Sequence, residues 1–110
     1  MKDDSNNNKQ LKFTEREIEF LLENEVCRIA TSYKDIPHIT TVSYIYENGL
    51  IYFATDYSTR KYQILEENKR IAVIVDIYNS SIDNKAVVIQ GIVEFIEKSK
   101  EFKRPLSKIR

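Results

Sequence analysis

Strand, turn and helix follow one another in the stretch IYFATDYSTRKYQIL, residues 51–65. The apolar run gives way to a polar turn, and Ser58 or Thr59 is the natural N-cap of the helix that follows. Arg60 and Lys61 then fall in the first turn, where the partial positive charge of a helix N-terminus disfavours cations. Two cations beside free backbone N–H groups indicate an anion site, above all a site for phosphate. The alternative interpretation is that Arg60 and Lys61 are a solvated surface pair.

The composition describes one small domain without a strong electrostatic field. A chain of 110 residues suits a single domain with a modest core. Lys+Arg and Asp+Glu both number 17, so the net charge of zero argues against nucleic acid or an anionic membrane as the partner. The single cysteine, Cys27, suits a reducing cytoplasm. Residues 1–11 are polar and lack the apolar segment of a signal peptide, so we expect a disordered tail there and one domain over residues 12–110.

N-terminal to the quoted stretch, the sequence predicts a helix with a well-formed start. Thr14 and Glu17 are spaced as a capping box. The helix is expected to run to about residue 24, with Ile18, Leu21 and Leu22 facing the core. This helix opens with glutamate, as the helix dipole prefers, whereas the later helix opens with Arg-Lys.

Three strands are expected between the first helix and the Arg-Lys turn. Residues 26–33 and 38–46 are rich in β-branched and aromatic side chains, which favour strands. The turn between them, residues 34–37, ends in a proline that is expected to block further pairing. Asn48-Gly49 is a strong hairpin signal, so residues 50–55 are predicted to return as the third strand.

The remaining pattern completes a mainly β fold. A helix over residues 60–68 precedes a near-continuous apolar strand, residues 70–78, which we expect to be buried on both faces. A polar loop over residues 79–84 leads to a long strand, residues 85–96, that contains Gly91. Five antiparallel strands favour a small β-barrel with a leading helix and a short helix between strands, because closure removes exposed sheet edges.

The order of these elements over residues 13–96 resembles the pyridoxamine 5′-phosphate oxidase-like family of FMN-binding split barrels. The order and spacing of several short motifs carry the resemblance. They are Arg28-Ile29-Ala30-Thr31, Pro37-His38, Ile51-Tyr52-Phe53-Ala54-Thr55, Thr59-Arg60-Lys61 and Gly91-Ile92-Val93-Glu94.

The resemblance implies FMN bound at the interface of a homodimer. In this family pattern the Arg-Lys pair grips the 5′-phosphate, the end of the preceding strand touches the phosphate or ribityl side, and an earlier strand runs along the isoalloxazine through its backbone. The cofactor-binding residues implied in this chain are Ile39, Thr40, Thr41, Val42, Ser43, Ala54, Thr55, Ser58, Thr59, Arg60 and Lys61.

The chain also departs from the family pattern. Family oxidases use a glutamine near the position of Ala86, and Gln90 is the nearest substitute. The chain has no Trp, whereas the oxidases proper bind substrate with a C-terminal segment that carries Trp and Arg. The resemblance therefore implies a relative of that enzyme rather than the enzyme itself.

No catalytic set of protein side chains can be assembled from the sequence. A zinc site is disfavoured by one His and one Cys. His38 is interpreted as a surface residue, Arg28 as the partner of a carboxylate on an exposed face, and the strand tyrosines as barrel packing. The chemistry would then fall to the cofactor, which favours an FMN-dependent oxidoreductase with a small-molecule redox substrate. The alternatives are a non-enzymatic protein that binds or senses flavin, haem or deazaflavin, and a nucleic-acid-binding barrel, which the charge balance disfavours.

Overall fold

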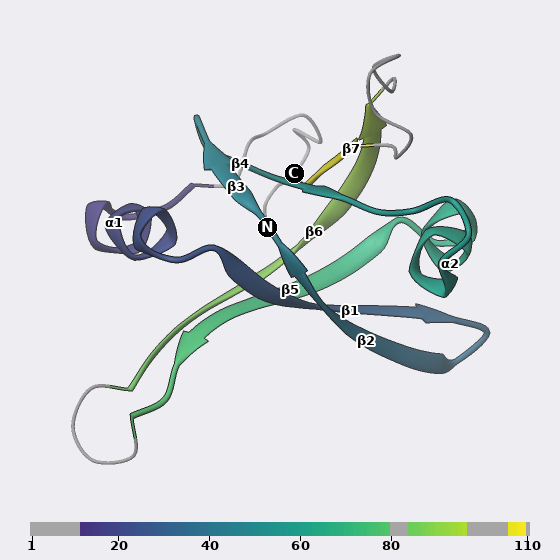
Figure 1. Ribbon diagram of the computed structural model, residues 1–110, viewed down its shortest axis with the longest axis horizontal. Helices are drawn as coiled ribbons and strands as arrows, with labels where there is room; N and C mark the ends of the chain where they lie inside the picture. The colour runs from purple at the N-terminus through teal and green to yellow at the C-terminus, as the bar shows by residue number, and fades with distance from the viewer. Residues whose placement is uncertain (1–11, 80–83, 97–105, 110) are drawn as a thin grey trace, which may run out of the picture.

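The computed structural model describes residues 12–79, 84–96 and 106–109. Two helices and seven strands make up this part of the chain (Figure 1). In chain order they are α1 (Glu15–Glu23), β1 (Val26–Tyr33), β2 (Ile36–Ser43), β3 (Ile45–Glu47), β4 (Leu50–Ala54), α2 (Arg60–Glu67), β5 (Arg70–Ile77), β6 (Lys85–Ile96) and β7 (Leu106–Ile109). The expected tail, residues 1–11, lies outside the described residues.

The strands form one antiparallel sheet in the order β2-β1-β5-β6-β7-β4-β3. The long strand β6 joins its two halves, because residues 85–92 pair with β5 and residues 93–96 pair with β7. The two ends of the order, β2 and β3, are consecutive in the chain and are separated by Tyr44 alone. The sheet therefore curls back on itself as a barrel that is mainly β, and α1 and α2 lie on opposite sides of it (Figure 1).

The predicted strand over residues 38–46 is divided in two, which corrects the count of five strands. Tyr44 lies at the division and is buried. Its hydroxyl donates to the carbonyl of Leu21 at 2.6 Å, and its N–H donates to the carbonyl of Glu25 at 2.9 Å. These bonds anchor the bend to the last turn of α1 and to the residues that follow it. A seventh strand, β7, pairs with both β4 and β6 and was not among the expected strands.

The first turn is tighter than predicted. Lys34 and Asp35 alone form it, with φ of 53° and 65°, and β2 begins at Ile36. Pro37 therefore lies inside β2, opposite Ser32, and the expectation that it blocks pairing is wrong. A proline is tolerated there because β2 is at one end of the strand order, where a missing N–H costs no ladder bond.

Helix α1 has the predicted cap, and its predicted inward face is confirmed at Leu21 but wrong at Leu22. The Glu17 N–H donates to Thr14 Oγ1 at 3.2 Å, and the Thr14 N–H donates to Glu17 Oε1 at 2.8 Å, so the capping box is confirmed. Phe20 and Leu21 are the buried residues, whereas Leu22 is 63% exposed. Successive helix residues differ by about 100° around the axis. Packing on the Phe20 side therefore turns Leu22 toward solvent.

The sheet has a buried inner face and an open outer face. Strand β5 shows the division, because Ile71, Val73 and Val75 are buried on the inner face while Ala72 and Ile74 are half-buried on the outer face. The expectation that this strand is buried on both faces is therefore wrong. Helix α2 covers the inner face, where its Leu65 is fully buried in the core. Within the described residues, nothing covers the outer face.

Candidate functional site

The predicted cofactor residues lie where β2 and β4 come near each other without pairing. Strand β3 pairs with β4, and extending that register would set Ser43 opposite Ala54 and Val42 opposite Thr55. Strand β2 instead pairs with β1 along its whole length, with Val42 opposite Cys27. The far edge of β2 and the end of β4 are therefore left facing a split in the barrel. Residues from two distant parts of the sequence are brought to this split, as the family pattern implies.

The β2 residues of the predicted site present their side chains to both faces of the sheet. Ile39, Thr41 and Ser43 lie on the outer face and are exposed. Thr40 and Val42 alternate with them and lie on the inner face, toward α2. Only these two side chains share the inner face with the start of α2. The other three side chains point to the outer face, so only their backbone groups can lie at the split.

Thr59 is the N-cap of α2, which resolves the two candidates that the sequence left open. The Tyr62 N–H donates to Thr59 Oγ1 at 3.2 Å, and the Thr59 hydroxyl donates to the carbonyl of Asp56 at 2.8 Å. Ser58 is exposed and lies outside the cap. The first turn of α2 contains no acidic residue. Arg60 is exposed at the first helical position, so its guanidinium is open to solvent.

Lys61 is buried at the start of α2, with 8% of its surface exposed. Burial lowers the pKa of its ammonium, and the charges of Asp56 and Cys27 oppose that shift. The described part of the chain offers this ammonium no hydrogen bond and no ion pair. A buried cation is costly when no anion is hydrogen-bonded to it, and Asp56 acts on Lys61 only through its charge. Lys61 is therefore not half of a solvated surface pair, and its position fits a site that receives an anion.

Unpartnered hydroxyl groups lie around the same split. The buried Oγ1 atoms of Thr40 and Thr55 have no hydrogen-bond partner among the described residues. Thr31 Oγ1 and His38 Nδ1 are also buried and have no partner among the described residues. Thr31 lies opposite His38 in the pairing of β1 with β2, on the face that also carries Thr40. Because buried polar groups in proteins nearly always have partners, this cluster fits a missing polar ligand or water.

Thr31 and His38 were not among the predicted site residues. His38 was interpreted as a surface residue, yet the residue is half-buried and its Nδ1 is buried. The signal that could have found both residues is strand alternation. His38 is two residues from Thr40, and residues two apart on a strand share one face.

Cys27 lies close enough to Lys61 for their charges to interact, but it is not a reactive thiol. Its side chain is 1% exposed, and burial raises the pKa of the thiol to about 11, with Lys61 opposing the shift. A protonated thiol is a poor nucleophile. Cys27 therefore fits a structural residue of the core.

The substitute glutamine does not reach this site within one chain. Gln90 and Ala86 are both exposed on the outer face of β6. The interpretation of Arg28 is confirmed, because its Nη1 lies 2.7 Å from Asp76 Oδ1 on that same face.

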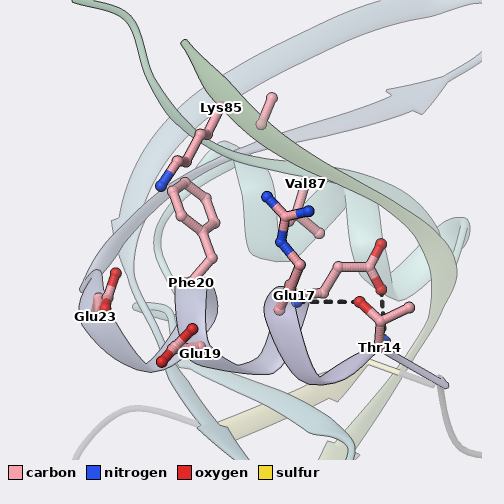
Figure 2. Close-up of a pocket in the computed structure, with 9 residues that line it drawn as sticks. Thr14, Glu17, Glu19, Phe20, Glu23, Lys85 and Val87 are labelled. Atoms are coloured by element: carbon pink, nitrogen blue, oxygen red, sulfur yellow. Dashed lines mark hydrogen bonds between the residues drawn. The ribbon is translucent and has the colours of Figure 1, made fainter. Parts of the chain in front are cut away.

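A hollow of about 360 Å³ between α1 and the start of β6 is a rival site (Figure 2). Phe20 forms its apolar part beside the chain of Lys85, while Glu19 and Glu23 point away from it (Figure 2). The polar groups of Thr14 and Glu17 are already bonded to each other there. This hollow contains none of the predicted site residues and none of the unpartnered buried atoms.

The sequence matches the family model described as pyridoxamine 5′-phosphate oxidase over residues 13–109. No protein in the curated reference set matches the chain by sequence. No helix among the described residues has the length and apolar character that crossing a membrane requires.

Solved structures share the fold over most of their length. A conserved hypothetical protein from Mycobacterium tuberculosis aligns with a TM-score of 0.77 and 18% identity, covering 96% of this chain and 85% of that one. An FAD-binding protein from Mesorhizobium loti aligns at 0.74 and 18%, covering 88% of each chain. A haem storage protein from Vibrio cholerae aligns at 0.72 and 14%, covering 87% of this chain and 88% of that one. At these identities the likeness shows the fold alone.

Proposed function

Because the chain belongs to the pyridoxamine 5′-phosphate oxidase family, we propose that it is an FMN-binding flavoprotein whose phosphate site lies at the start of α2. The single observation that carries the proposal is Lys61, a buried lysine whose ammonium makes no hydrogen bond or ion pair among the described residues, although the charge of Asp56 lies near. A phosphate ester at this position would supply a hydrogen-bonded anion.

The residues around the split fit a phosphate group. Phosphate offers acceptor oxygens, and the donors here are the Lys61 ammonium, the hydroxyls of Thr40 and Thr55, and the free N–H groups of the first turn of α2. Arg60 lies at the exposed side, where its planar fork can meet two oxygens. Each group that is unpartnered in the structure would gain a partner.

The same site favours FMN over FAD. Thr55 is 2% exposed and Lys61 is 8% exposed, so the donors lie deep in the site. The phosphate of FMN is the end of the molecule, so it can occupy a buried site that has one opening. The diphosphate of FAD has to continue out of it toward its adenosine. We infer that FAD is the weaker ligand.

The chain contributes binding and orientation rather than acid–base chemistry. A bound flavin supplies hydride or electron transfer, and the protein supplies its position and electrostatic surroundings. The edge of β2 that faces the split presents backbone groups from Thr40 to Ser43 to the ring. We therefore propose a flavin-dependent oxidoreductase that acts on a small-molecule redox substrate, located in the cytoplasm, where a free thiol such as Cys27 is stable.

We further propose that the protein is a homodimer that buries the outer face of the sheet. Val26, Ile39, Val88 and Ile92 are 50%, 65%, 65% and 45% exposed, and the strand register places all four on that face. Gathered apolar side chains of this kind mark interaction surfaces. Light scattering should give twice 13.0 kDa, and a monomer that binds FMN stoichiometrically would contradict the dimer.

The test of function is a comparison of ligands on the purified protein. FMN is expected to bind more tightly than FAD, and riboflavin more weakly than FMN, because riboflavin lacks the phosphate. Flavin fluorescence quenching measures all three affinities. Bleaching of the bound flavin by NADH or NADPH would support a reductase. A Soret band with added haem and no flavin binding would contradict the proposal and favour a haem-binding protein.

A further inference from the structure

A second hollow opens on the outer face of the sheet, at the place where β1 and β5 separate. The pairing between these strands ends at Ala30 opposite Ala72. Beyond that pair the strands diverge toward α2, and Asn68 Nδ2 bonds the carbonyl of Ser32 at 2.9 Å (Figure 1). The space that results is about 690 Å³, within the range of about 300–1,000 Å³ typical of small-molecule sites.

The floor of this hollow is lined by small residues. Ala30, Ala72 and Gly91 come from three adjacent strands, and Ala30 pairs with Ala72 across β1 and β5. Side chains this small leave the sheet surface accessible to a planar molecule. Ile92 and Pro37 add apolar walls on two sides. The floor therefore suits a ring rather than a flexible polar chain.

Polar groups without partners stand at the wall and rim. Arg70 and Gln90 line the hollow and are both exposed. In the part of the chain that the structure describes, neither the Arg70 guanidinium nor the Gln90 amide makes a hydrogen bond or an ion pair. A free guanidinium beside a free amide is suited to a planar oxyanion.

We propose that this hollow binds a small planar carboxylate, with its ring on the Ala30–Ala72 floor and its carboxylate at Arg70. The site is separate from the phosphate site, since its floor lies on the outer face whereas Thr40 and Lys61 lie on the inner face. It also does not depend on the flavin. If a second copy packs on the outer face, the hollow becomes a recess at the subunit seam, a common place for small-molecule sites.

The experiment uses benzoate as the probe and benzamide as its neutral counterpart of the same shape. The full chain, with and without FMN, is titrated with each while the backbone amides of Ala30, Ala72 and Gly91 are followed by NMR. Benzoate should shift these amides saturably in both states. Benzamide should bind about tenfold more weakly, because the charged hydrogen bonds to Arg70 are lost.

Variants separate Arg70 from general charge effects. Arg70→Gln should weaken benzoate about tenfold and leave benzamide unchanged, because only the charged ligand uses the guanidinium. Arg16→Gln removes the same charge from α1 and should change neither affinity. Equal binding of benzoate and benzamide, equal effects of the two variants, or no saturable shift at these amides would each overturn the proposal. Normal FMN binding in the same samples would show that the proposed function stands without it.

Discussion

The two helices of this protein begin in opposite ways. At α1 the backbone and side chains of Thr14 and Glu17 satisfy each other, and two glutamates stand in the first turn. At α2 the Thr59 hydroxyl serves one N–H, the first turn has no acidic residue, and Arg60 and Lys61 follow the cap. The N-terminus of α1 is satisfied by its own side chains, whereas the N-terminus of α2 has no acidic group and could receive an anion.

The difference indicates that a binding site at the start of α2 would lower the stability of the free protein. An acidic first turn stabilises a helix, while a cationic one is disfavoured by the helix dipole. Burying Lys61 without a partner adds a further cost, as does the burial of Thr55 Oγ1. In the proposed function, phosphate binding would offset these costs. Substitutions at α1 should therefore alter stability alone, whereas substitutions at α2 should alter ligand affinity.

The largest expected effect is that of Lys61→Met. Loss of the buried ammonium should weaken FMN by about ten- to a hundredfold, because a hydrogen bond to a charged group contributes about 1.5–3 kcal/mol. Riboflavin affinity should be unchanged, and the free protein should be no less stable, since an apolar chain replaces a buried charge. Fluorescence titration and urea unfolding measure the two effects. Lys85→Met, which removes an exposed ammonium, is the control, and equal losses for both flavins would mean that Lys61 supports the fold.

The second effect concerns Cys27, whose charge interacts with that of Lys61. The thiol pKa is raised from 9.0 to about 11 in the folded chain, so the unfolded thiol ionises first. Its contribution to stability is complete below pH 9 and is lost as the pH rises through about 11, a change of about 2–3 kcal/mol. Lys61, whose pKa is lowered, changes stability in the opposite direction.

Urea unfolding at pH 8 and at pH 11 tests this for wild type and Cys27→Ala. The alkaline loss of stability should be smaller in the variant. Tyr44, whose pKa is raised to about 12 by burial and by the charge of Cys27, also titrates in this range, so its part of the alkaline loss should shrink together with that of Cys27 in the variant. Parallel pH dependences would show that Cys27 is not the group that titrates.

The third effect is that of Thr55→Val, which removes an unpartnered hydroxyl and keeps the shape of the side chain. FMN affinity should fall about tenfold, because one donor to the phosphate is lost. The stability of the free protein should stay the same or rise. Thr41→Val, on the outer face of β2, should leave FMN affinity unchanged. A stability loss without an affinity loss would place Thr55 in the core rather than in the site.

The smallest expected effect is that of Thr14→Ala, which removes the capping box at the N-terminus of α1. The lost cap should lower the unfolding free energy by about 1 kcal/mol. FMN affinity should not change at a temperature where the variant is folded. Chemical denaturation and flavin titration of the same preparation measure both quantities. A large affinity loss without unfolding would mean that α1 also contributes to the site.

Local sequence was enough to predict both helix starts and one hairpin. The capping box depends on residues three apart, and Asn48-Gly49 forms the expected turn with φ of 53° and 81°. The division of the second strand at Tyr44 could not be predicted in this way. It depends on hydrogen bonds to Leu21 and Glu25, about twenty residues earlier in the chain, and local strand propensity carries no signal of such contacts.

The site was predicted in part for the same reason. The order of short motifs located Arg60 and Lys61, but only the fold shows that the first is exposed and the second buried. Thr31 and His38 were missed because their place on the face of Thr40 depends on the register between β1 and β2. Their environment follows from pairing with residues distant in sequence.

The most direct test of the central claim follows both helix starts in one NMR spectrum. Inorganic phosphate, FMN and riboflavin are added in turn, and the backbone amides of residues 59–62 are compared with those of residues 15–18. Phosphate and FMN should shift the amides at α2 saturably and leave those at α1 unchanged. Riboflavin should shift amides along β2 but not those at the start of α2. Equal shifts at both helix starts, or none at α2 with bound FMN, would contradict the account.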